Sequence, residues 1–173
     1  HEYVSLETAL SEADIISLHT PLTTSGEYPT WHLLNEQNLS LLKQDVCLIN
    51  ASRGEVIDNK ALYAHIEERE QRGDRAIKLV LDVWEGEPSP LPELIERTDI
   101  ATAHIAGYSL EGKARGTEIL YQAVCQLFGK SPVTTLADLL PPAEVAGVTL
   151  TESVSSVNKL KPLVHLVYDV RRD

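Results

Sequence analysis

Residues 48–58 read LINASRGEVID and predict a strand, a turn and the start of a helix. The strand is expected from residues 46–49, which are apolar or nearly so. Arg53 follows in a run of small residues, and Asp58 is a suitable N-cap for the helix. Arg53 is therefore expected at the carboxyl end of a parallel strand, where open α/β sheets bind ligands. Its guanidinium can hold a planar carboxylate through two parallel hydrogen bonds, or it can simply cap a neighbouring carbonyl group.

Strands and helices alternate along most of the chain. Apolar runs at residues 15–18, 77–83 and 100–103 predict three more strands, and the run at 77–83 is apolar enough to be buried on both faces. Helical patterns cover the ranges 6–13, 35–43, 59–72, 91–97 and 110–128. This alternation predicts an α/β fold with a parallel sheet and right-handed crossovers.

The composition of the chain changes near residue 132. Residues 136–140 and the pair Pro141-Pro142 indicate a boundary, and residues 145–150 predict the first strand of a different unit. Residues 159–170 predict an apolar helix, in which Pro162 is tolerable only within the first turn. We therefore divide the chain at this point, into residues 1–132 and residues 133–173.

Composition excludes several classes of partner. A net charge of −11 over 173 residues argues against nucleic-acid binding, which needs clustered Lys and Arg. No apolar run approaches the roughly 20 residues of a membrane span, and the first residues lack a signal-peptide pattern. Cys47 and Cys125 lie in apolar contexts without CxxC spacing, which is typical of reduced cysteines in a cytoplasmic protein. The chain also begins without Met, so we expect it to be a piece of a longer protein.

Three chemically active side chains fall at the ends of successive predicted strands. Arg53 follows the strand at 46–49, Glu87 follows the strand at 77–83, and His104 follows the strand at 100–103. Histidine carries protons near neutral pH, and a carboxylate on its second ring nitrogen would hold its tautomer. Taken singly, Glu87 could be a solvated loop acid and His104 a satisfied core imidazole. The three together predict a site for acid–base chemistry on a carboxylate.

Two other kinds of site do not fit the sequence. Residues 107–114, GYSLEGKA, approach the phosphate-binding pattern GxxxxGK[ST], but the last position is Ala114 and has no hydroxyl for Mg²⁺. The six histidines are scattered, without an HxxxH or HxxE pattern, so no metal site is predicted.

Four segments together resemble the D-2-hydroxyacid dehydrogenase superfamily. They are HTPLTTSGEYPTWHLL at 19–34, LINASRGEVIDNKAL at 48–62, LVLDVWEGEP at 79–88 and HIAGYSLEGKARGT at 104–117. Within the superfamily, the loop around Gly26, the run after His104 and LVHLVYDVRRD at 163–173 resemble the branch that oxidises 4-phospho-D-erythronate to the 2-oxo acid in vitamin B6 biosynthesis.

This resemblance implies an NAD-dependent enzyme, homodimeric at full length, acting on a small phosphorylated 2-hydroxy acid. Arg53 would anchor the substrate carboxylate, His104 would be the acid–base group and Glu87 its partner. Tyr108 would contact the substrate. Lys113 and Arg115 are candidates for its phosphate, the alternative for each being a place on the helix surface without that role. The positions that match the lining of the NAD site are Thr20, Ala51, Ser52, Arg53, Asp82 and Gly107.

The chain departs from the family pattern in two respects. Ala103 stands where the family usually has Pro, which could loosen the backbone of His104. The glycine-rich GxGxxG turn and the ribose-binding acid are absent from these 173 residues. The resemblance therefore implies that residues 1–132 are the second half of a Rossmann-type NAD-binding domain with its following long helix. Residues 133–173 would be a linker and the beginning of an α+β dimerisation domain, and the chain alone is expected to be inactive. The alternatives are a dehydrogenase for another 2-hydroxy acid, such as 3-phosphoglycerate, and a non-catalytic, NAD-sensing dimeric scaffold.

Overall fold

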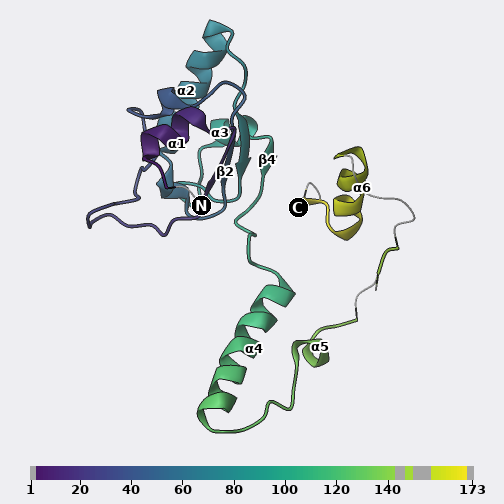
Figure 1. Ribbon diagram of the computed structural model, residues 1–173. Coiled ribbons are helices and arrows are strands. Elements are labelled where there is room, and N and C mark those ends of the chain that lie inside the picture. Colours follow the sequence, from purple (N-terminus) through teal and green to yellow (C-terminus); the bar gives the residue numbers. More distant parts are fainter. Residues whose placement is uncertain (1–2, 143–146, 150–156, 171–173) are drawn as a thin grey trace. The chain divides into compact units, whose positions relative to one another are not determined.

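The computed structural model describes residues 3–142, 147–149 and 157–170, without the side chains of residues 157–159. Its contacts divide the chain into two compact units, and the boundary along the chain falls between residues 104 and 105. Figure 1 shows the elements of both units, which are described separately below. The domain boundary predicted at residue 132 stays a prediction.

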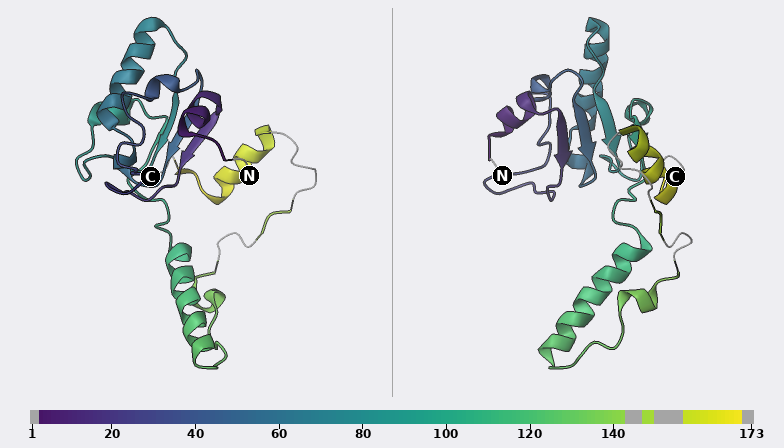
Figure 2. Two further views of the ribbon diagram at one scale, coloured as in Figure 1. Left: turned by 60° about the vertical axis from the view of Figure 1, so that its left-hand side comes forward. Right: turned by 45° about the vertical axis from the view of Figure 1, so that its right-hand side comes forward.

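The first unit is built on a four-stranded parallel sheet. Its strands are β1 (Ile15–Leu18), β2 (Cys47–Asn50), β3 (Lys78–Leu81) and β4 (Ile100–Ala101). They lie in the order β1-β2-β3-β4, and each neighbouring pair is parallel (Figure 2). The predicted α/β fold with a parallel sheet is confirmed, and the carboxyl ends of all four strands meet at one edge.

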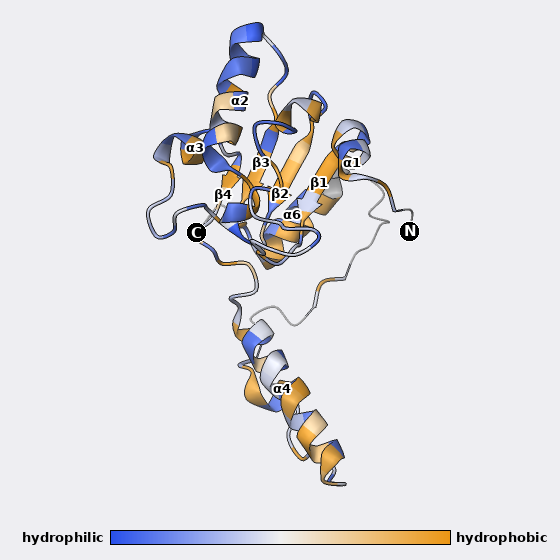
Figure 3. Ribbon diagram, turned by 90° about the vertical axis from the view of Figure 1, so that its left-hand side faces the viewer, coloured by the Kyte–Doolittle hydropathy of each residue, from blue (hydrophilic) through white to orange (hydrophobic). Residues whose placement is uncertain are grey.

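Helices cover one face of this sheet. They are α1 (Leu6–Glu12), α2 (Asn59–Arg72) and α3 (Pro92–Glu96), and two 3₁₀ helices, η1 (Leu39–Leu41) and η2 (Gly54–Val56), lie in the connections. Because the strand order follows the chain order, right-handed crossovers place successive connections on the same side. Figure 3 views the sheet from the side of α1, α2 and α3 and shows predominantly hydrophobic strands behind them. Leu10, Leu62 and Leu94, one from each helix, belong to the buried core cluster.

Burial along β3 alternates, which differs from the prediction for residues 77–83. Leu79 and Leu81 are buried under the helices, whereas Val80 is half-buried and Lys78 is exposed. The strand β2 alternates in the same way, with Leu48 buried. Within the described residues only one face of the sheet is fully covered, because the crossovers all lie on that face.

The predicted helix ends are confirmed for the two helices before the site. Ser5 caps α1 by accepting a hydrogen bond from the Thr8 N–H, and Asp58 caps α2 by accepting one from the Ala61 N–H. At the other end of α2, Gly73 adopts φ +73°, the left-handed conformation that glycine takes without strain. These caps set where each helix begins and ends relative to the strands.

The helix predicted at residues 35–43 is wrong. The structure has only the three-residue 3₁₀ helix η1 within this range. Asn38 accepts a hydrogen bond from the Asn35 N–H and donates to the carbonyl of Leu33, while Asn35 donates to the carbonyl of His32. Asparagine side chains that bond to nearby backbone groups compete with helical hydrogen bonds, and here they prevail.

The second unit contains α4 (Leu110–Leu127), α5 (Leu136–Leu139) and α6 (Val157–Val167). Ser109 caps α4 as predicted, and the Leu136 N–H donates to Glu118 of α4 at 2.7 Å. Several apolar side chains of α4 are exposed: Leu110, Ile119, Leu120, Val124 and Leu127. No helix among the described residues is long and apolar enough to span a membrane.

Two predictions for the end of the chain need comment. The helix α6 begins earlier than predicted, so Pro162 lies in its interior rather than in its first turn. A proline there removes one backbone hydrogen bond of the helix. The strand predicted at 145–150 falls largely outside the described residues, and residues 147–149 have no regular secondary structure.

Candidate active site

The three predicted catalytic side chains lie at the same edge of the sheet. Arg53 follows β2, Glu87 follows β3 and His104 follows β4, and these three strands are consecutive neighbours. All three residues belong to the first unit. The expected placement at adjacent strand ends is therefore found.

Glu87 and His104 form a hydrogen-bonded pair. Their Oε2 and Nδ1 atoms lie 2.8 Å apart, and the second carboxylate oxygen of Glu87 accepts a hydrogen bond from the Trp84 N–H at 2.8 Å. With its Nδ1 proton donated to Glu87, a neutral His104 presents an unprotonated Nε2 as an acceptor. Both side chains are partly exposed, at 35% for Glu87 and 44% for His104, so a ligand can reach them.

The surroundings of Glu87 favour its ionised form. Burial raises the pKa of the Glu87 carboxyl, but the hydrogen bonds from His104 and from the Trp84 N–H outweigh it, and the net pKa is lowered. A lowered pKa means that the stabilisation from this carboxylate is present above the ordinary glutamate range and is lost as pH falls through the lowered value. The pair is therefore intact at neutral pH.

The backbone of His104 is held in an uncommon conformation. Its φ is +57°, a left-handed region that few non-glycine residues occupy and in which Asn, Asp and His are the commonest of them. The His104 N–H donates to the carbonyl of Asp82 at 2.8 Å, and the Asp82 carboxylate accepts from the Thr102 hydroxyl at 2.6 Å. The Asp82 carbonyl thus holds the backbone of His104, and the Asp82 carboxylate holds Thr102, two residues before it. The loosening that Ala103 could cause stays a prediction. Strained residues are typical of sites whose surroundings demand the geometry.

Arg53 lies exposed in a loop whose backbone is well held. The Asn50 amide donates to the carbonyl of Arg53 at 2.9 Å and accepts from both the N–H and the hydroxyl of Ser52. The guanidinium donates one hydrogen bond, to the carbonyl of Ser52 at 2.6 Å, which is the capping contact considered as the alternative. A guanidinium has five N–H donors, so this contact still leaves donors for a carboxylate.

The loops that carry Arg53 and Glu87 touch through Gly54. A Cβ atom added at Gly54 would lie 2.0 Å from the backbone carbonyl carbon of Trp84. No side chain fits at such a distance, so the two loops can approach only because residue 54 is glycine. The placement of Arg53 relative to Glu87 depends directly on this contact.

A second group of predicted residues lines a cavity of about 450 Å³ beside Arg53. Thr20, Ala51 and Ser52 contribute to its walls. The Thr20 hydroxyl is buried and has no hydrogen-bond partner, which marks a place for a polar group of a ligand. The amide, hydroxyl and phosphate groups of a dinucleotide could satisfy it, and the small side chains of Ala51 and Ser52 leave room. These residues therefore fit NAD.

Gly107 and Tyr108 belong to the second unit, so their predicted contacts with NAD and substrate stay predictions. Gly107 has φ +77°, a conformation suited to glycine. The Tyr108 ring is exposed, and the Lys113 ammonium lies 3.5 Å above its centroid, in cation–π contact. This contact gives Lys113 of α4 a partner in the residues just before that helix.

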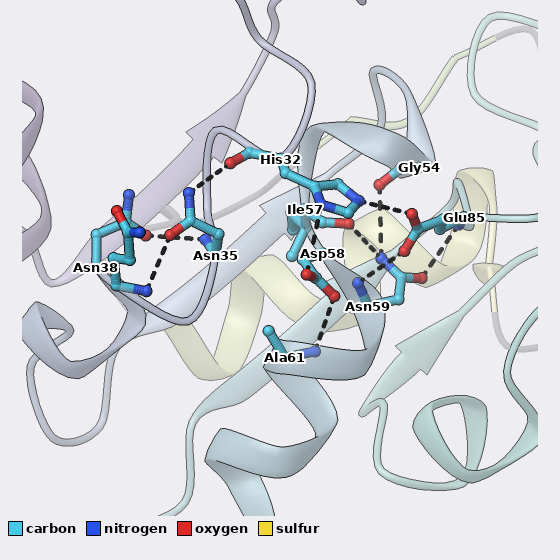
Figure 4. Close-up of polar contacts among 10 residues, drawn as sticks. His32, Asn35, Asn38, Gly54, Ile57, Asp58, Asn59, Ala61 and Glu85 are labelled. Atoms are coloured by element: carbon cyan, nitrogen blue, oxygen red, sulfur yellow. Dashed lines mark hydrogen bonds and ion pairs between the residues drawn. The ribbon is translucent and has the colours of Figure 1, made fainter.

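Sequence reasoning missed a polar network beside the site (Figure 4). His32 lies between two carboxylates, with Nε2 at 2.6 Å from Glu85 and Nδ1 at 3.4 Å from Asp58. Asn59 exchanges two hydrogen bonds of 3.1 Å with Glu85. The members come from three separate segments, so no local motif could reveal them. The only available signal was that Glu85 lies two residues before Glu87 in the same loop.

His32, Asp58 and Glu85 are also close enough together to bind one metal ion, since their potential ligand atoms lie within 4.8 Å of one another. The two ring nitrogens of His32, however, face different carboxylates. One oxygen of Asp58 accepts the Ala61 N–H, and one of Glu85 accepts the Asn59 N–H. This arrangement satisfies the three side chains as a hydrogen-bonded and ionic network within the protein.

Known proteins with similar sequences are dehydrogenases. The chain is 53% identical over 172 residues to the erythronate-4-phosphate dehydrogenase of Shewanella oneidensis and 52% identical over 171 residues to that of Aeromonas salmonicida. Each alignment covers 99% of this chain and 44% of the relative. The chain thus spans less than half the length of these relatives.

Two solved structures with a similar fold are also dehydrogenases. D-lactate dehydrogenase from Aquifex aeolicus, complexed with NAD and lactic acid, matches with 33% identity and a TM-score of 0.55, over 80% of this chain and 42% of that one. The apo D-mandelate dehydrogenase of Rhodotorula graminis matches with 28% identity and a TM-score of 0.61, over 76% of this chain and 36% of that one. Residues 1–106 match the sequence model of the NAD-binding domain of D-isomer specific 2-hydroxyacid dehydrogenases. The chain therefore belongs to the D-isomer specific 2-hydroxyacid dehydrogenase family.

Proposed function

We propose that the whole protein oxidises 4-phospho-D-erythronate at C2 to the 2-oxo acid with NAD, in the biosynthesis of pyridoxal 5′-phosphate. The observation that carries this proposal is the Glu87–His104 hydrogen bond of 2.8 Å, at the same sheet edge as Arg53. The two relatives above support the choice of substrate, since each is named for erythronate 4-phosphate.

The residues take complementary roles in this proposal. Arg53 binds the substrate carboxylate through two N–H groups and so fixes the orientation of C2. His104 Nε2 accepts the proton of the C2 hydroxyl, while Glu87 holds the ring through Nδ1 and favours the imidazolium that forms. NAD, when bound, accepts the hydride that leaves C2. The products are the 2-oxo acid, NADH and a proton, which His104 releases to solvent.

Thr20, Ala51, Ser52 and Asp82 are proposed to lie along the NAD site, together with Gly107. The buried, unpartnered hydroxyl of Thr20 supports this placement. Tyr108 is proposed to contact the substrate, and Lys113 and Arg115 are candidates for its phosphate. All of these roles are proposed for the full-length protein and not for the 173 residues alone.

Steady-state kinetics of the full-length protein test the proposal. We expect a higher kcat/KM with 4-phospho-D-erythronate than with 3-phosphoglycerate or D-lactate, each measured as NADH formation. Preference for 3-phosphoglycerate would assign the enzyme to another substrate of the same family. Absence of turnover with all three acids, with NADH still bound, would favour the alternative of an NAD-sensing scaffold.

The pH dependence of the Glu87→Gln variant tests the role of Glu87. Glutamine has one acceptor oxygen, so if it keeps the Trp84 N–H bond it turns its NH₂ group toward His104 Nδ1, and this neutral amide no longer favours a protonated imidazole. Since His104 must be unprotonated to accept the hydroxyl proton, we expect the acid limb of the kcat profile to move to lower pH. The measurement is kcat from pH 5 to pH 9 in both proteins. An unchanged profile would remove Glu87 from the mechanism.

The whole protein is further proposed to be a cytoplasmic homodimer. The support is the row of exposed apolar side chains on α4, since contiguous apolar surface commonly marks an interface. The domain division at residue 132 would place α4 with the NAD-binding domain. Size-exclusion chromatography with light scattering of the full-length protein gives the oligomeric state.

A further inference from the structure

The loop that carries Glu87 is held in place by residues other than Arg53 and His104. Glu85 and Glu87 flank Gly86 in the turn that follows β3, and the carboxylate of Glu87 faces His104. The side chain and backbone N–H of Glu85 instead bond to groups in two other segments of the first unit. The position of Glu87 therefore depends on contacts made two residues earlier.

Both carboxylate oxygens and the backbone N–H of Glu85 take part in these contacts. Its Oε1 accepts from His32 Nε2 at 2.6 Å, its Oε2 accepts from the Asn59 N–H at 3.1 Å, and its own N–H donates to Asn59 Oδ1 at 3.1 Å. Asn59 is 4% exposed and donates its amide to the carbonyl of Ile57 at 2.8 Å. Glu85 is thus bound to the first residue of α2, which is anchored in turn.

The His32 ring is itself fixed in place. Its backbone N–H donates to the carbonyl of Glu55 at 2.8 Å, and its ring stacks on Trp31 with centroids 3.7 Å apart. The side chain is only 17% exposed. His32 also has φ +50°, a conformation that non-glycine residues rarely adopt and that asparagine and histidine adopt more often than most. Asparagine therefore suits this backbone position as well as histidine does, but of the two only histidine places a ring N–H against Glu85.

We infer that His32 is a positioning residue for the dehydrogenase reaction: its Nε2–H holds Glu85, and Glu85 holds the turn in which Glu87 meets His104. The inference rests on the proposed function. A displacement of the order of 1 Å at a catalytic group can cost up to about 10²-fold in rate. Loss of the His32 contact should therefore lower kcat without removing any group that touches the substrate.

Two replacements of His32 separate this role from a purely structural one. Glutamine can place an amide N–H near the position of Nε2 and retain the bond to Glu85, whereas asparagine reaches only the position of Nδ1, beside Asp58. If His32 served only the backbone, His32→Asn would be the better tolerated variant, because Asn suits φ +50°. The positioning role predicts the opposite order.

For His32→Asn in the full-length protein we expect kcat to fall about ten- to a hundredfold, with both KM values within about twofold of wild type. His32→Gln should restore kcat to within about threefold. Asp58→Asn is the matched control, because asparagine also caps helices and the change removes only the carboxylate near Nδ1; its kcat should stay within about twofold. Equal kcat in His32→Asn and wild type, or a lower kcat in His32→Gln than in His32→Asn, would overturn the inference.

A spectroscopic measurement makes the test independent of the substrate. The Nδ1 proton of His104, hydrogen-bonded to Glu87, is observed in ¹⁵N-histidine spectra and assigned by its loss in His104→Asn. It should persist in wild type and His32→Gln and be weakened or lost in His32→Asn. If His32→Asn does not fold, Glu85→Gln replaces it, since one amide oxygen cannot accept from both His32 and Asn59. A signal unchanged in the folded variant would contradict the inference.

The test of the substrate and the test of His32 can fail independently of each other. If wild type prefers another 2-hydroxy acid, the same variants are compared with that acid, because the Glu87–His104 pair does not depend on the substrate chain. If wild type turns over none of the acids, the proposed function fails while the His104 signal still decides the role of His32.

Discussion

Replacement of His104 by asparagine is expected to lower kcat of the full-length protein by about two to four orders of magnitude, the usual contribution of a general acid–base group. Asparagine has no group that accepts the hydroxyl proton near neutral pH. It does tolerate the φ of +57° at this position, so the backbone and its hydrogen bond to Asp82 should be retained. The expected loss is therefore chemical rather than conformational.

The measurement is kcat under saturation with both substrates, alongside NADH affinity by fluorescence titration. The NADH Kd and the melting temperature should stay close to the wild-type values, because His104 is replaced without disturbing the sheet. A kcat within tenfold of wild type would show that the hydroxyl proton leaves by another route and would exclude His104 as the base.

Replacement of Arg53 by lysine should lower kcat/KM about ten- to a hundredfold although the charge is kept. An ammonium cannot reproduce the two parallel hydrogen bonds of a guanidinium with a carboxylate. The loss of one charge-assisted hydrogen bond, about 1.5–3 kcal/mol, corresponds to a factor of this size. The loop should stay folded, because Asn50 bonds to backbone groups of Arg53 and Ser52 and not to the guanidinium.

The matched control for Arg53→Lys is Arg75→Lys. Arg75 is an exposed arginine that precedes β3 and pairs with Asp45 on the surface. It lies at the amino ends of the strands, away from the candidate site. Its replacement should leave kcat/KM within about twofold of wild type. Comparable losses in both variants, or none in Arg53→Lys, would contradict a role for Arg53 in binding the carboxylate.

Local patterns in the sequence determined most of the secondary structure of the first unit. Apolar runs predicted the four strands, and capping residues such as Asp58 and Gly73 marked helix ends, because capping satisfies backbone groups within a few residues. The failure at residues 35–43 has a local cause as well. Asn35 and Asn38 compete for the backbone there, and a pattern based on apolar spacing does not weigh such bonds.

The placement of the candidate site also followed from the sequence. The carboxyl ends of parallel strands share one edge, so residues that follow three adjacent strands must gather there. This rule brought Arg53, Glu87 and His104 to one edge without any knowledge of their contacts. Their detailed roles stay predictions, to be tested by the variants above.

Only the tertiary structure decided how the site is held. The contact of His32 with Glu85 joins residues 53 positions apart, and no sequence spacing specifies such a bond. The approach of Gly54 to the backbone of Trp84 and the strained φ of His104 are likewise set by the packing of whole loops. Strand and helix patterns depend on interactions within a few residues, whereas these features depend on which surfaces meet after the sheet has formed. Hydrogen bonds and burial within a few residues can therefore be predicted from the sequence. Contacts between segments that are far apart in the chain are known only from the tertiary structure.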